Sequence, residues 1–262
     1  MMGLMDGKKA LVMGVANQRS LAWGISQALH REGAELAFSY VPDDRMKRNL
    51  DRLLGELEGA ADASCIPCDV QDSAQVEALF NAIGEQWGSL DVFVHSISFA
   101  NRDEITGRYS EISRDGFLLA QSVNTYSLIE CSRNAAPLMQ AAGGGSIMTM
   151  TYLASERVVP NYAVMSAAKA SLESSVRYLA ADLGPDNIRV NAISAGPMRT
   201  LAASAVRGIQ GARELMEERA PLRRNITLAE VGNVGLFLAS DLSSCVTGQA
   251  LYADCGFAIT AM

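Results

Sequence analysis

The sequence predicts an α/β fold with one doubly wound parallel sheet of seven strands. Short apolar runs alternate along the 262 residues with segments that repeat apolar positions at helical spacing. Neither a long polar linker nor an internal repeat divides the chain. Strands that alternate with helices pair in parallel, because each helix carries the chain back to the starting edge of the sheet. We therefore expect a single domain over residues 1–262.

Composition points to an ordinary soluble globule and excludes several classes of function. Apolar residues make up 49% of the chain and charged residues 19%, which suits one large buried core. The net charge of -7 comes without a cluster of Lys and Arg, so we expect no nucleic-acid partner. Apolar runs such as residues 10–15 fall far short of the roughly 20 residues that span a bilayer, so we expect no membrane partner. The first residues lack an apolar signal core, which predicts a cytoplasmic protein.

Five cysteines are scattered along the chain, at positions 65, 68, 131, 245 and 255. In a reducing compartment we interpret them as reduced core residues. Cys65 and Cys68 form a C-x-x-C pair ahead of a helical pattern, so a redox pair is the less favoured alternative. We predict no metal site, because the two histidines, His30 and His95, lack the spacing of metal ligands.

The first strand, loop and helix are predicted at residues 9–14 and 20–31. The strand reads KALVMG, and apolar positions recur at helical spacing after Ser20. Gly14 stands where the strand must turn sharply, and Ser20 stands where a helix needs an N-cap. A helix that begins there directs free amides at an anion above it. A tight turn without a ligand is the alternative, since the loop lacks the full G-x-G-x-x-G pattern of dinucleotide sites.

A second strand is predicted at residues 34–40, and the charged residues after it would meet an adenosine ribose. Asp43 and Asp44 could accept hydrogen bonds from ribose hydroxyls and would repel a 2′-phosphate, which favours NADH as the coenzyme. Arg45 and Lys47 keep NADPH open. A solvated turn without a ligand is the alternative interpretation of the two aspartates.

A third short strand is predicted at residues 64–68, after a helix at 45–57. At the end of this strand, Asp69 could accept a hydrogen bond from an adenine amino group while Val70 packs on the ring. The alternative is that Asp69 caps the following turn. Residues 76–83 then carry the apolar stripe of a core-facing helix.

The fourth and fifth strands are predicted at residues 91–97 and 146–151. An open α/β sheet presents its ligand-contacting groups at the carboxyl ends of its strands. His95 lies within an apolar run, so we interpret it as a hydrogen-bonded interior residue, with a catalytic role as the less favoured alternative. Residues 111–139 hold a helical pattern that three glycines end, and the fifth strand leads directly into Tyr152.

The remaining elements follow the same alternation. We predict a helix at residues 162–183, a strand at 188–194, a helix at 228–238 and a last strand at 249–254. After the sixth strand comes the run AGPMRTLAAS, a Gly-Pro turn followed by small residues. Such a segment can order over a ligand and supply backbone amides and a hydroxyl. We therefore expect a substrate-covering segment at about 195–215.

Tyr162 and Lys169 are the residues around which the predicted site is organised. They are seven apart, close to two turns at 3.6 residues per turn, so on a helix they share one face. An ammonium near a phenol lowers the cost of phenolate character, which makes Tyr162 a candidate acid or anion stabiliser. The alternative is an amphipathic helix with both side chains on its wet edge.

Several motifs together resemble the short-chain dehydrogenase/reductase superfamily. They are Gly14-x5-Ser20-x-Ala22, Asp69-Val70, the run HSISFA at 95–100, Tyr152-x9-Tyr162-x6-Lys169 and the run NAISAGPMRTLAAS at 191–204. Within the superfamily they are most similar to the enoyl-acyl-carrier-protein reductases of bacterial type II fatty acid synthesis. Five residues between Gly14 and Ser20, and a tyrosine ten residues before Tyr162, separate this branch from the others. An ordinary ketone reductase would place a serine at the position of Thr149.

The resemblance implies a Rossmann-like, dinucleotide-binding catalytic domain and a role for each matching residue. Tyr162, Lys169 and Tyr152 would be catalytic, and Lys169 would also hold the nicotinamide ribose. Ala100, Tyr152 and Tyr162 would contact the acyl substrate. The cofactor, NADH with NADPH left open, would be bound by Gly14, Ser20, Leu21, Val41, Asp69, Val70, Ile97, Lys169, Met198, Arg199, Thr200, Leu201 and Ala202.

The activity implied by the resemblance is reduction of the C2=C3 double bond of trans-2-enoyl-acyl-carrier-protein thioesters by NADH, the last step of the fatty acid elongation cycle. Hydride arriving at C3 drives negative charge onto the thioester oxygen, so a donor must face that oxygen, and we assign Tyr162 to this role. The implied partners are the acyl carrier protein that bears the enoyl group and further copies of the chain in a homotetramer. A ketone or alcohol oxidoreductase of the superfamily and a non-catalytic dinucleotide sensor are the alternatives.

The sequence departs from the family pattern at a few positions. Ser98 stands where glycine is common and adds bulk beside the nicotinamide site. Val41 offers adenosine no polar side chain. Asn124 stands where ordinary superfamily members carry a catalytic asparagine, and in this branch we expect it to be structural.

Overall fold

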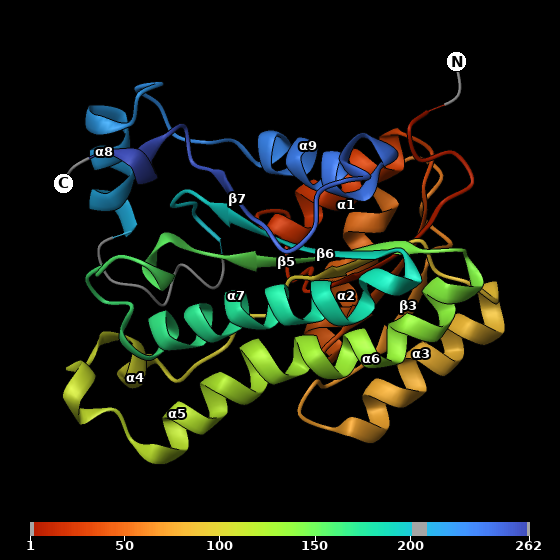
Figure 1. Cartoon of the computed structure of the whole chain (residues 1–262), viewed down its shortest axis with the longest axis horizontal. Coiled ribbons are helices and arrows are strands. Elements are labelled where there is room, and N and C mark those ends of the chain that lie inside the picture. Colours follow the sequence, from red (N-terminus) through yellow and green to blue (C-terminus); the bar gives the residue numbers. More distant parts are fainter. Residues whose placement is uncertain (1–2, 201–208, 261–262) are drawn as a thin grey trace.

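The fold is built on one parallel sheet with helices on both of its faces (Figure 1). It is a computed structural model, and it describes residues 3–200 and 209–260. Over these residues the sheet has seven strands in the order β3-β2-β1-β4-β5-β6-β7, and each neighbouring pair is parallel. The predicted doubly wound, Rossmann-like sheet is confirmed.

The strands and helices follow the predicted alternation. The strands are β1 (Lys9–Met13), β2 (Glu35–Tyr40), β3 (Ser64–Pro67), β4 (Val92–His95), β5 (Gly145–Thr151), β6 (Ile188–Ala195) and β7 (Ala250–Ala253). The α-helices are α1 (Leu21–Arg31), α2 (Asp44–Gly55), α3 (Ser73–Trp87), α4 (Arg102–Thr106), α5 (Arg114–Gln121), α6 (Ser127–Ala141), α7 (Ala163–Leu183), α8 (Ile209–Arg219) and α9 (Leu228–Ala239). Shorter helical turns are η1 (Tyr109–Glu111), η2 (Ser122–Tyr126), η3 (Leu153–Ser155), η4 (Gly184–Asp186), η6 (Asp241–Ser243) and η7 (Phe257–Ile259).

Alternate residues of the strands pack into two separate cores, one on each face of the sheet. In β1, Ala10 and Val12 join the core formed with α1, α2 and α9, whereas Leu11 and Met13 join the core formed with α3, α6 and α7. Successive strand side chains point to opposite faces, and helices cover both, so the strands read as continuous apolar runs. Figure 1 shows α1 and α9 on one side of the sheet and α3, α6 and α7 on the other.

We predicted one continuous helical stretch over residues 111–139, and this prediction is wrong because the stretch is interrupted. The structure divides this stretch into η1, α5, η2 and α6, and η2 is a π-helical turn. Within it, Asn124 Nδ2 donates to the Ala120 carbonyl at 2.8 Å, and Thr125 Oγ1 donates to the Ala168 carbonyl at 3.0 Å. Wide turns of this kind interrupt helices frequently at functional sites, and this one anchors α5 and α6 to the middle of α7.

The cysteines are free, and the sheet separates the C-x-x-C pair. Cys65 packs into the core beside α1 and Cys68 into the core beside α3, because side chains three apart on an extended segment point opposite ways. The redox-pair alternative is therefore wrong. The expectation that all the cysteines are core residues is wrong for Cys245, which is exposed.

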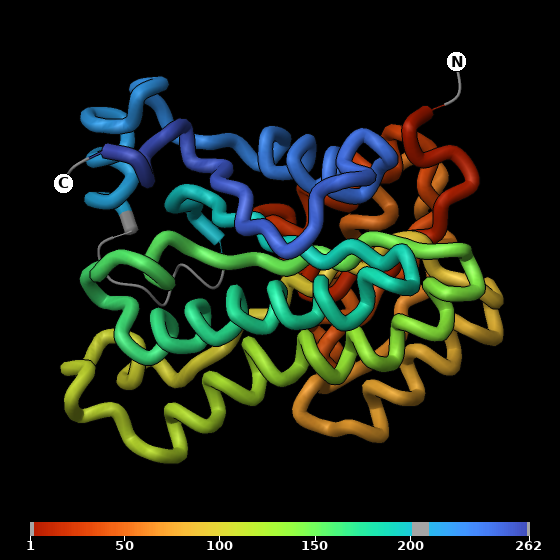
Figure 2. Tube along the Cα trace, in the orientation of Figure 1, coloured from red at the N-terminus to blue at the C-terminus, as the bar shows by residue number. Residues whose placement is uncertain are grey.

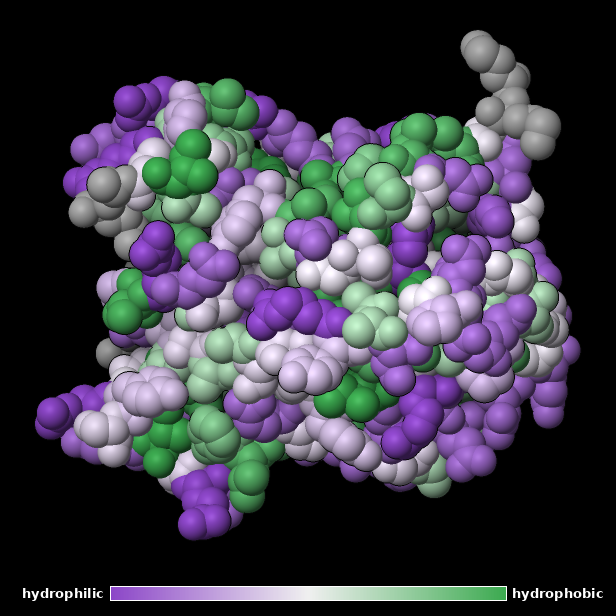
Figure 3. Space-filling model, viewed as in Figure 1, coloured by the Kyte–Doolittle hydropathy of each residue, from purple (hydrophilic) through white to green (hydrophobic). Residues whose placement is uncertain are grey.

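The surface in Figure 3 intersperses polar and apolar side chains over the face shown. Among the residues that the structure describes, no helix is both long and apolar enough to cross a membrane. Within the same residues, no group of three or more His, Cys, Asp or Glu side chains is placed to hold a metal ion.

Helices α1 and α9 meet through two glycines, Gly24 and Gly232. A Cβ added to Gly232 would lie 2.3 Å from the Gly24 carbonyl oxygen, and one added to Gly24 would lie 2.6 Å from the Leu228 carbonyl oxygen. The atoms in the way belong to the backbone, so they cannot rotate aside as a side chain would. The two helices can pack this closely only with glycine at both positions.

Gly232→Ala should push α9 away from α1 and lower the free energy of unfolding by about 1–3 kcal/mol, the range for overpacking a tight contact. The matched control is Gly55→Ala in α2, where an added Cβ meets nothing within 4 Å. Alanine favours a helix over glycine, so the control should match wild type or gain up to about 1 kcal/mol. Urea unfolding followed by circular dichroism measures both, and equal midpoints for Gly232→Ala and wild type would contradict the tight contact.

Candidate active site

Strands β1, β4, β5 and β6 end side by side at one edge of the sheet. The register pairs Met13 with His95, His95 with Thr149, and Thr149 with Ala192. Figure 2 shows the loop after β5 at the same end of the molecule as α8. Loops after the carboxyl ends of parallel strands form the ligand sites of α/β proteins, and most of the predicted site residues lie on these loops.

Gly14 begins the loop between β1 and α1, at the point where β1 and β4 part. Its φ is 97°, and an added Cβ would lie 2.0 Å from the carbonyl oxygen of Ser96. A side chain would be strained by the backbone angle and would collide with β4 as well. The sharp turn predicted at Gly14 is confirmed, and its cause is the close approach of the two strand ends.

Ser20 occupies the N-cap position of α1, but its hydroxyl does not cap the helix. Instead Ser20 Oγ accepts hydrogen bonds from the backbone amides of Ala16, at 3.0 Å, and Asn17, at 3.1 Å. Ser20 is therefore the N-cap residue as predicted, but the prediction that its side chain caps the helix is wrong. Because the hydroxyl is used to shape the loop, the amides of Leu21 and Ala22, the first two of α1, are not capped by a side chain and suit an anion.

The carboxylates predicted to meet adenosine have backbone partners of their own. Asp43 caps α2, accepting hydrogen bonds from the amides of Arg45 at 2.9 Å and Met46 at 3.0 Å. Asp69 accepts from the amide of Gln71 at 3.0 Å, so it also stabilises the turn after β3. Each residue thus performs the turn role that the sequence left open, through one of its two carboxylate oxygens.

Asn124 holds the loop that follows β4. Its Nδ2 donates to the Phe99 carbonyl at 2.7 Å, and its Oδ1 accepts from the Phe99 amide at 3.3 Å. The side chain is fully buried. Bonds to backbone on both sides support the expectation that Asn124 is structural, and they fix the position of Ala100 next to Phe99.

His95 is buried and hydrogen-bonded through both ring nitrogens. Nε2 lies 2.8 Å from Ser127 Oγ, and Nδ1 lies 3.2 Å from Thr149 Oγ1. Ser127 Oγ donates to the Val123 carbonyl, so Nε2 carries the proton and Thr149 donates to Nδ1. Burial, with the nearby charge of Lys169, lowers the pKa of His95 to about 3. The imidazole stays neutral at physiological pH, as expected for an interior residue.

Tyr152 and Tyr162 come together although ten residues separate them. Their ring centroids are 5.0 Å apart with an interplanar angle of 55°. Tyr152 follows β5, and Tyr162 is the N-cap residue of α7, one residue outside the helix in which we predicted it. The contact places both phenols at the carboxyl edge of the sheet, beside the loop from β4.

The pKa of Tyr162 moves in the opposite direction to the one predicted from the Tyr-Lys spacing. Burial raises it, and the neighbouring Tyr152 raises it further. Burial likewise raises the pKa of Tyr152. Removing a phenolate from water is costly, so the hydroxyl stays protonated near pH 7. Tyr162 is thus a neutral hydrogen-bond donor.

Lys169 is buried, with 3% of its surface exposed, and its ammonium is fixed to the end of β5. Nζ donates to the Met150 carbonyl at 2.8 Å. Burial lowers the pKa of Lys169 to about 8, although Glu173 opposes that shift. The side chain therefore keeps its charge at neutral pH and has two further donor hydrogens.

A small apolar cluster covers one side of the two phenols. Ala100 belongs to it, and Tyr162 packs against it. The other members come from α4, α5 and α7: Ile105, Ala120, Val164, Met165 and Ala168, with Ile112 packed at the edge. Ile97, from the loop before Ala100, packs instead into the core beside α3, next to Val70.

The segment predicted to cover the substrate begins as β6 ends. Met198 packs against the α1 core, Arg199 Nη2 donates to Gln210 Oε1 in α8, and the Thr200 amide donates to the Met198 carbonyl at 2.9 Å. Leu201 and Ala202 lie outside the described residues. Val41, by contrast, is exposed at the end of β2.

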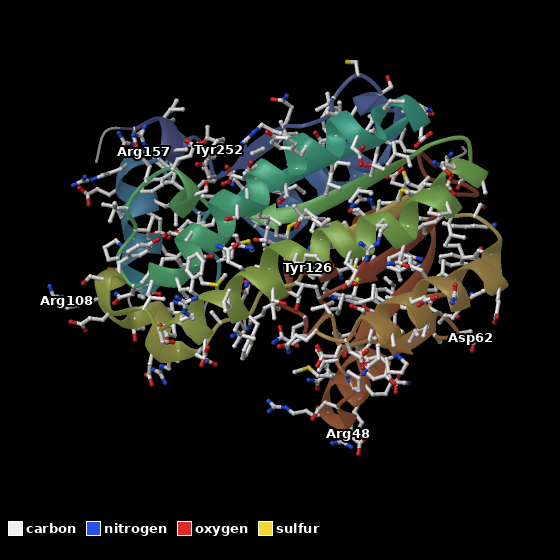
Figure 4. The ribbon with its side chains drawn as sticks, turned by 60° about the horizontal axis from the view of Figure 1, so that its bottom comes forward. Arg48, Asp62, Arg108, Tyr126, Arg157 and Tyr252 are labelled. Atoms are coloured by element: carbon white, nitrogen blue, oxygen red, sulfur yellow. The ribbon has the colours of Figure 1, made fainter. Side chains whose placement is uncertain are left out.

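The sequence interpretation missed two acidic residues at this edge. Glu173, one turn after Lys169 in α7, accepts a hydrogen bond from Thr151 Oγ1 at 2.5 Å. Burial and the neighbouring Glu156 raise the pKa of Tyr252 in β7 to about 12; Figure 4 labels Tyr252 and also Arg157, the residue after Glu156. The spacing of four between Lys169 and Glu173 could have revealed the first, whereas nothing local in the sequence links Glu156 to Tyr252.

Comparisons with known proteins agree on one family. A family model described as enoyl-(acyl carrier protein) reductase matches residues 14–258. The chain is 52% identical to enoyl-acyl-carrier-protein reductase (NADH) of a Nostoc species, over 98% of this chain and 99% of that protein. It is 48% identical to enoyl-acyl-carrier-protein reductase (NADPH) of Staphylococcus aureus, over 97% of each chain.

Solved structures give the same result. The crystal structure of the Bacillus cereus enoyl-acyl carrier protein reductase with NADP+ and indole naphthyridinone matches with a TM-score of 0.96, at 49% identity and with 100% of both chains covered. The enoyl-acyl-carrier-protein reductase (NADH) of Aquifex aeolicus matches with a TM-score of 0.93 at 41% identity, over 99% of this chain and 100% of that one. The chain belongs to the enoyl-acyl-carrier-protein reductase family.

Proposed function

We propose that the protein reduces the C2=C3 double bond of trans-2-enoyl-acyl-carrier-protein thioesters with NADH, and so completes the fatty acid elongation cycle. Similarity over nearly the whole length to enoyl-acyl-carrier-protein reductases supports this function. The observation that carries it is the contact of Tyr152 with Tyr162, with ring centroids 5.0 Å apart, at the strand edge that also holds the buried ammonium of Lys169.

Tyr162 stabilises the charge that reduction creates. NADH supplies a hydride to C3 of the enoyl group when it is bound. Negative charge then develops on the thioester oxygen, and a preorganised donor in a dry site stabilises it. The raised pKa of Tyr162 keeps its proton available for this hydrogen bond. Tyr152, whose ring packs on that of Tyr162, fixes the direction of the phenol and borders the acyl chain.

Lys169 holds the cofactor and adds positive charge to the site. Its Nζ has one hydrogen bond to the Met150 carbonyl, which leaves two donor hydrogens for the hydroxyls of the nicotinamide ribose. Its charge also favours an anionic transition state in surroundings of low polarity. The apolar cluster around Ala100, Val164 and Met165 suits an acyl chain and keeps water from the enolate.

The residues at the carboxyl edge fit a dinucleotide. Gly14 puts no side chain over the end of β1, and the side chain of Ser20 leaves the first amides of α1 uncapped for the pyrophosphate. The remaining assigned residues, Leu21, Val41, Asp69, Val70, Ile97, Met198, Arg199, Thr200, Leu201 and Ala202, would line the adenosine and nicotinamide portions. Asp43 and Asp44 favour NADH. Only one carboxylate oxygen of Asp43 caps α2, and the negative charge of this carboxylate would repel a 2′-phosphate.

The proposal also covers the oligomeric state of the protein and its cellular compartment. The chain would form one catalytic domain over residues 1–262 and act in the cytoplasm as a homotetramer. Large side chains exposed on α5, η2 and α7 support contact between copies, namely Phe117, Leu118, Tyr126 and Tyr178; Tyr126 is labelled in Figure 4. A groove beside them is lined by Ile129, Ser171, Ser174, Ser175, Tyr178, Leu179 and Asp182.

Tyr162→Phe should lower kcat by about 10²-fold or more, the usual contribution of a positioned proton donor. NADH affinity should stay within a few-fold of wild type, because the ring and its packing on Tyr152 remain. Steady-state assays with crotonyl thioester and NADH fluorescence titration measure the two effects. Tyr109→Phe, at an exposed tyrosine of η1, is the matched control and should be fully active. Full turnover by Tyr162→Phe would exclude Tyr162 as the donor.

Substrate choice separates the proposed reaction from its alternatives. We expect the protein to oxidise NADH with crotonyl thioesters and to ignore acetoacetyl thioesters, because its donor is aimed at the oxygen of a conjugated thioester. Turnover of the acetoacetyl thioester alone would assign a ketone reductase instead. NADH binding without turnover of either thioester would assign a sensor. Parallel assays with NADPH should give a lower kcat/KM, and the reverse order would overturn the coenzyme assignment.

A further inference from the structure

Glu173 is a buried carboxylate that the proposed reaction does not use directly. It lies four residues after Lys169 in α7, and 8% of its surface is exposed. Resting on the proposed function, we propose that Glu173 is a positioning residue for the reaction: its negative charge keeps the Lys169 ammonium, which Met150 holds at the end of β5, in its charged form. In this role it touches neither substrate nor cofactor and acts only through Lys169.

Two consecutive residues of β5 hold the two side chains. Lys169 Nζ donates to the Met150 carbonyl at 2.8 Å, and Thr151 Oγ1 donates to Glu173 Oε1 at 2.5 Å. Thr151 is itself buried, so water does not compete for this bond. Side chains four apart on a helix lie on one face, one above the other. The two side chains therefore lie on one face of α7, and each is held by one of two consecutive residues at the end of β5.

Stability alone does not explain a carboxylate at this position. Removing a carboxylate from water costs several kcal/mol in real proteins, and well-packed apolar residues often replace buried ion pairs without loss of stability. The order of the pair is also the weaker one for a helix, because Lys169 precedes Glu173, whereas Glu before Lys at this spacing stabilises helices better. The charge is therefore better explained by its effect on Lys169.

The groups that face this pair from other elements do not change charge between pH 6 and 9. His95 of β4 has a pKa of about 3, and burial raises the pKa of Tyr152 and of Tyr162. Tyr252 of β7, which feels the charges of Glu156, Glu173 and Asp254, has a pKa of about 12. Among these groups Lys169, with a pKa of about 8, titrates within the window.

The sign of the effect follows from these charges. Burial pulls the pKa of Lys169 down and Glu173 pushes it up. Without the carboxylate, Lys169 would lose its proton at a lower pH, and the neutral amine would bind the ribose hydroxyls less well. An opposite charge about 4–6 Å away shifts a pKa by about 1–3 units, and a more distant charge shifts it by less.

The test is the pH dependence of NADH binding, measured by fluorescence titration from pH 6 to 9 on wild type and Glu173→Gln. Gln keeps the size of the side chain and an oxygen for Thr151, and removes only the charge. Wild-type affinity should weaken as the pH rises through about 8. In the variant this midpoint should fall by about one unit, so that the dissociation constants agree at pH 6, differ by up to about fivefold at pH 8 and approach a tenfold difference at pH 9.

Two further variants control for the charge and the position of Glu173. Glu173→Asp keeps the charge and should restore most of the wild-type midpoint. Glu130→Gln removes another buried carboxylate, in α6 and paired with Arg133, and should leave the profile unchanged. Parallel profiles for Glu173→Gln and wild type, or weakened binding at pH 6 as well, would overturn the inference in favour of a structural role. Failure of wild type to bind NADH or to reduce crotonyl thioester would instead overturn the proposed function.

Discussion

The hydrogen bond from Lys169 to the Met150 carbonyl is the contact on which the site depends. It joins the longest helix, α7, to the end of β5, and both elements lead into the paired tyrosines. The helix begins one residue after Tyr162 and the strand ends one residue before Tyr152. By fixing helix and strand to each other, this one bond fixes where the two phenols meet.

Burial, more than pairwise charge, decides the protonation state of each group at the site. It raises the pKa of both phenols and lowers that of His95, so these groups are neutral at physiological pH. It also lowers the pKa of Lys169, but only to about 8, so Lys169 keeps most of its charge at neutral pH. His95, which is fully buried at this edge, is hydrogen-bonded to Ser127 and Thr149. The site thus combines neutral hydrogen-bonding groups with the buried charge of Lys169.

Much of the fold and part of the site could be predicted from the sequence. Apolar runs and helical periods are local, so the seven-stranded order of elements was predictable, as were Gly14 at its turn and the helix that carries Lys169. The contact between Tyr152 and Tyr162 depends on how a loop closes between β5 and α7, and spacing does not encode that closure. The π-helical turn at 122–126 was missed because side-chain bonds from Asn124 and Thr125 to distant carbonyls create it. The hydroxyl of Ser20 accepts hydrogen bonds from amides of the preceding loop and not from amides of α1. Both sets of amides are close to Ser20 in the sequence, so spacing alone does not decide between them.

A crystal structure of the protein with NAD+ and a non-reducible enoyl thioester tests the central claim most directly. The phenol of Tyr162, partly buried and protonated, should lie with its hydroxyl about 2.6–3.2 Å from the thioester oxygen, within hydrogen-bond reach. Lys169 should contact the ribose while keeping its bond to Met150. A hydroxyl turned away from the nicotinamide ring, with no space for a thioester between the two, would contradict the claim.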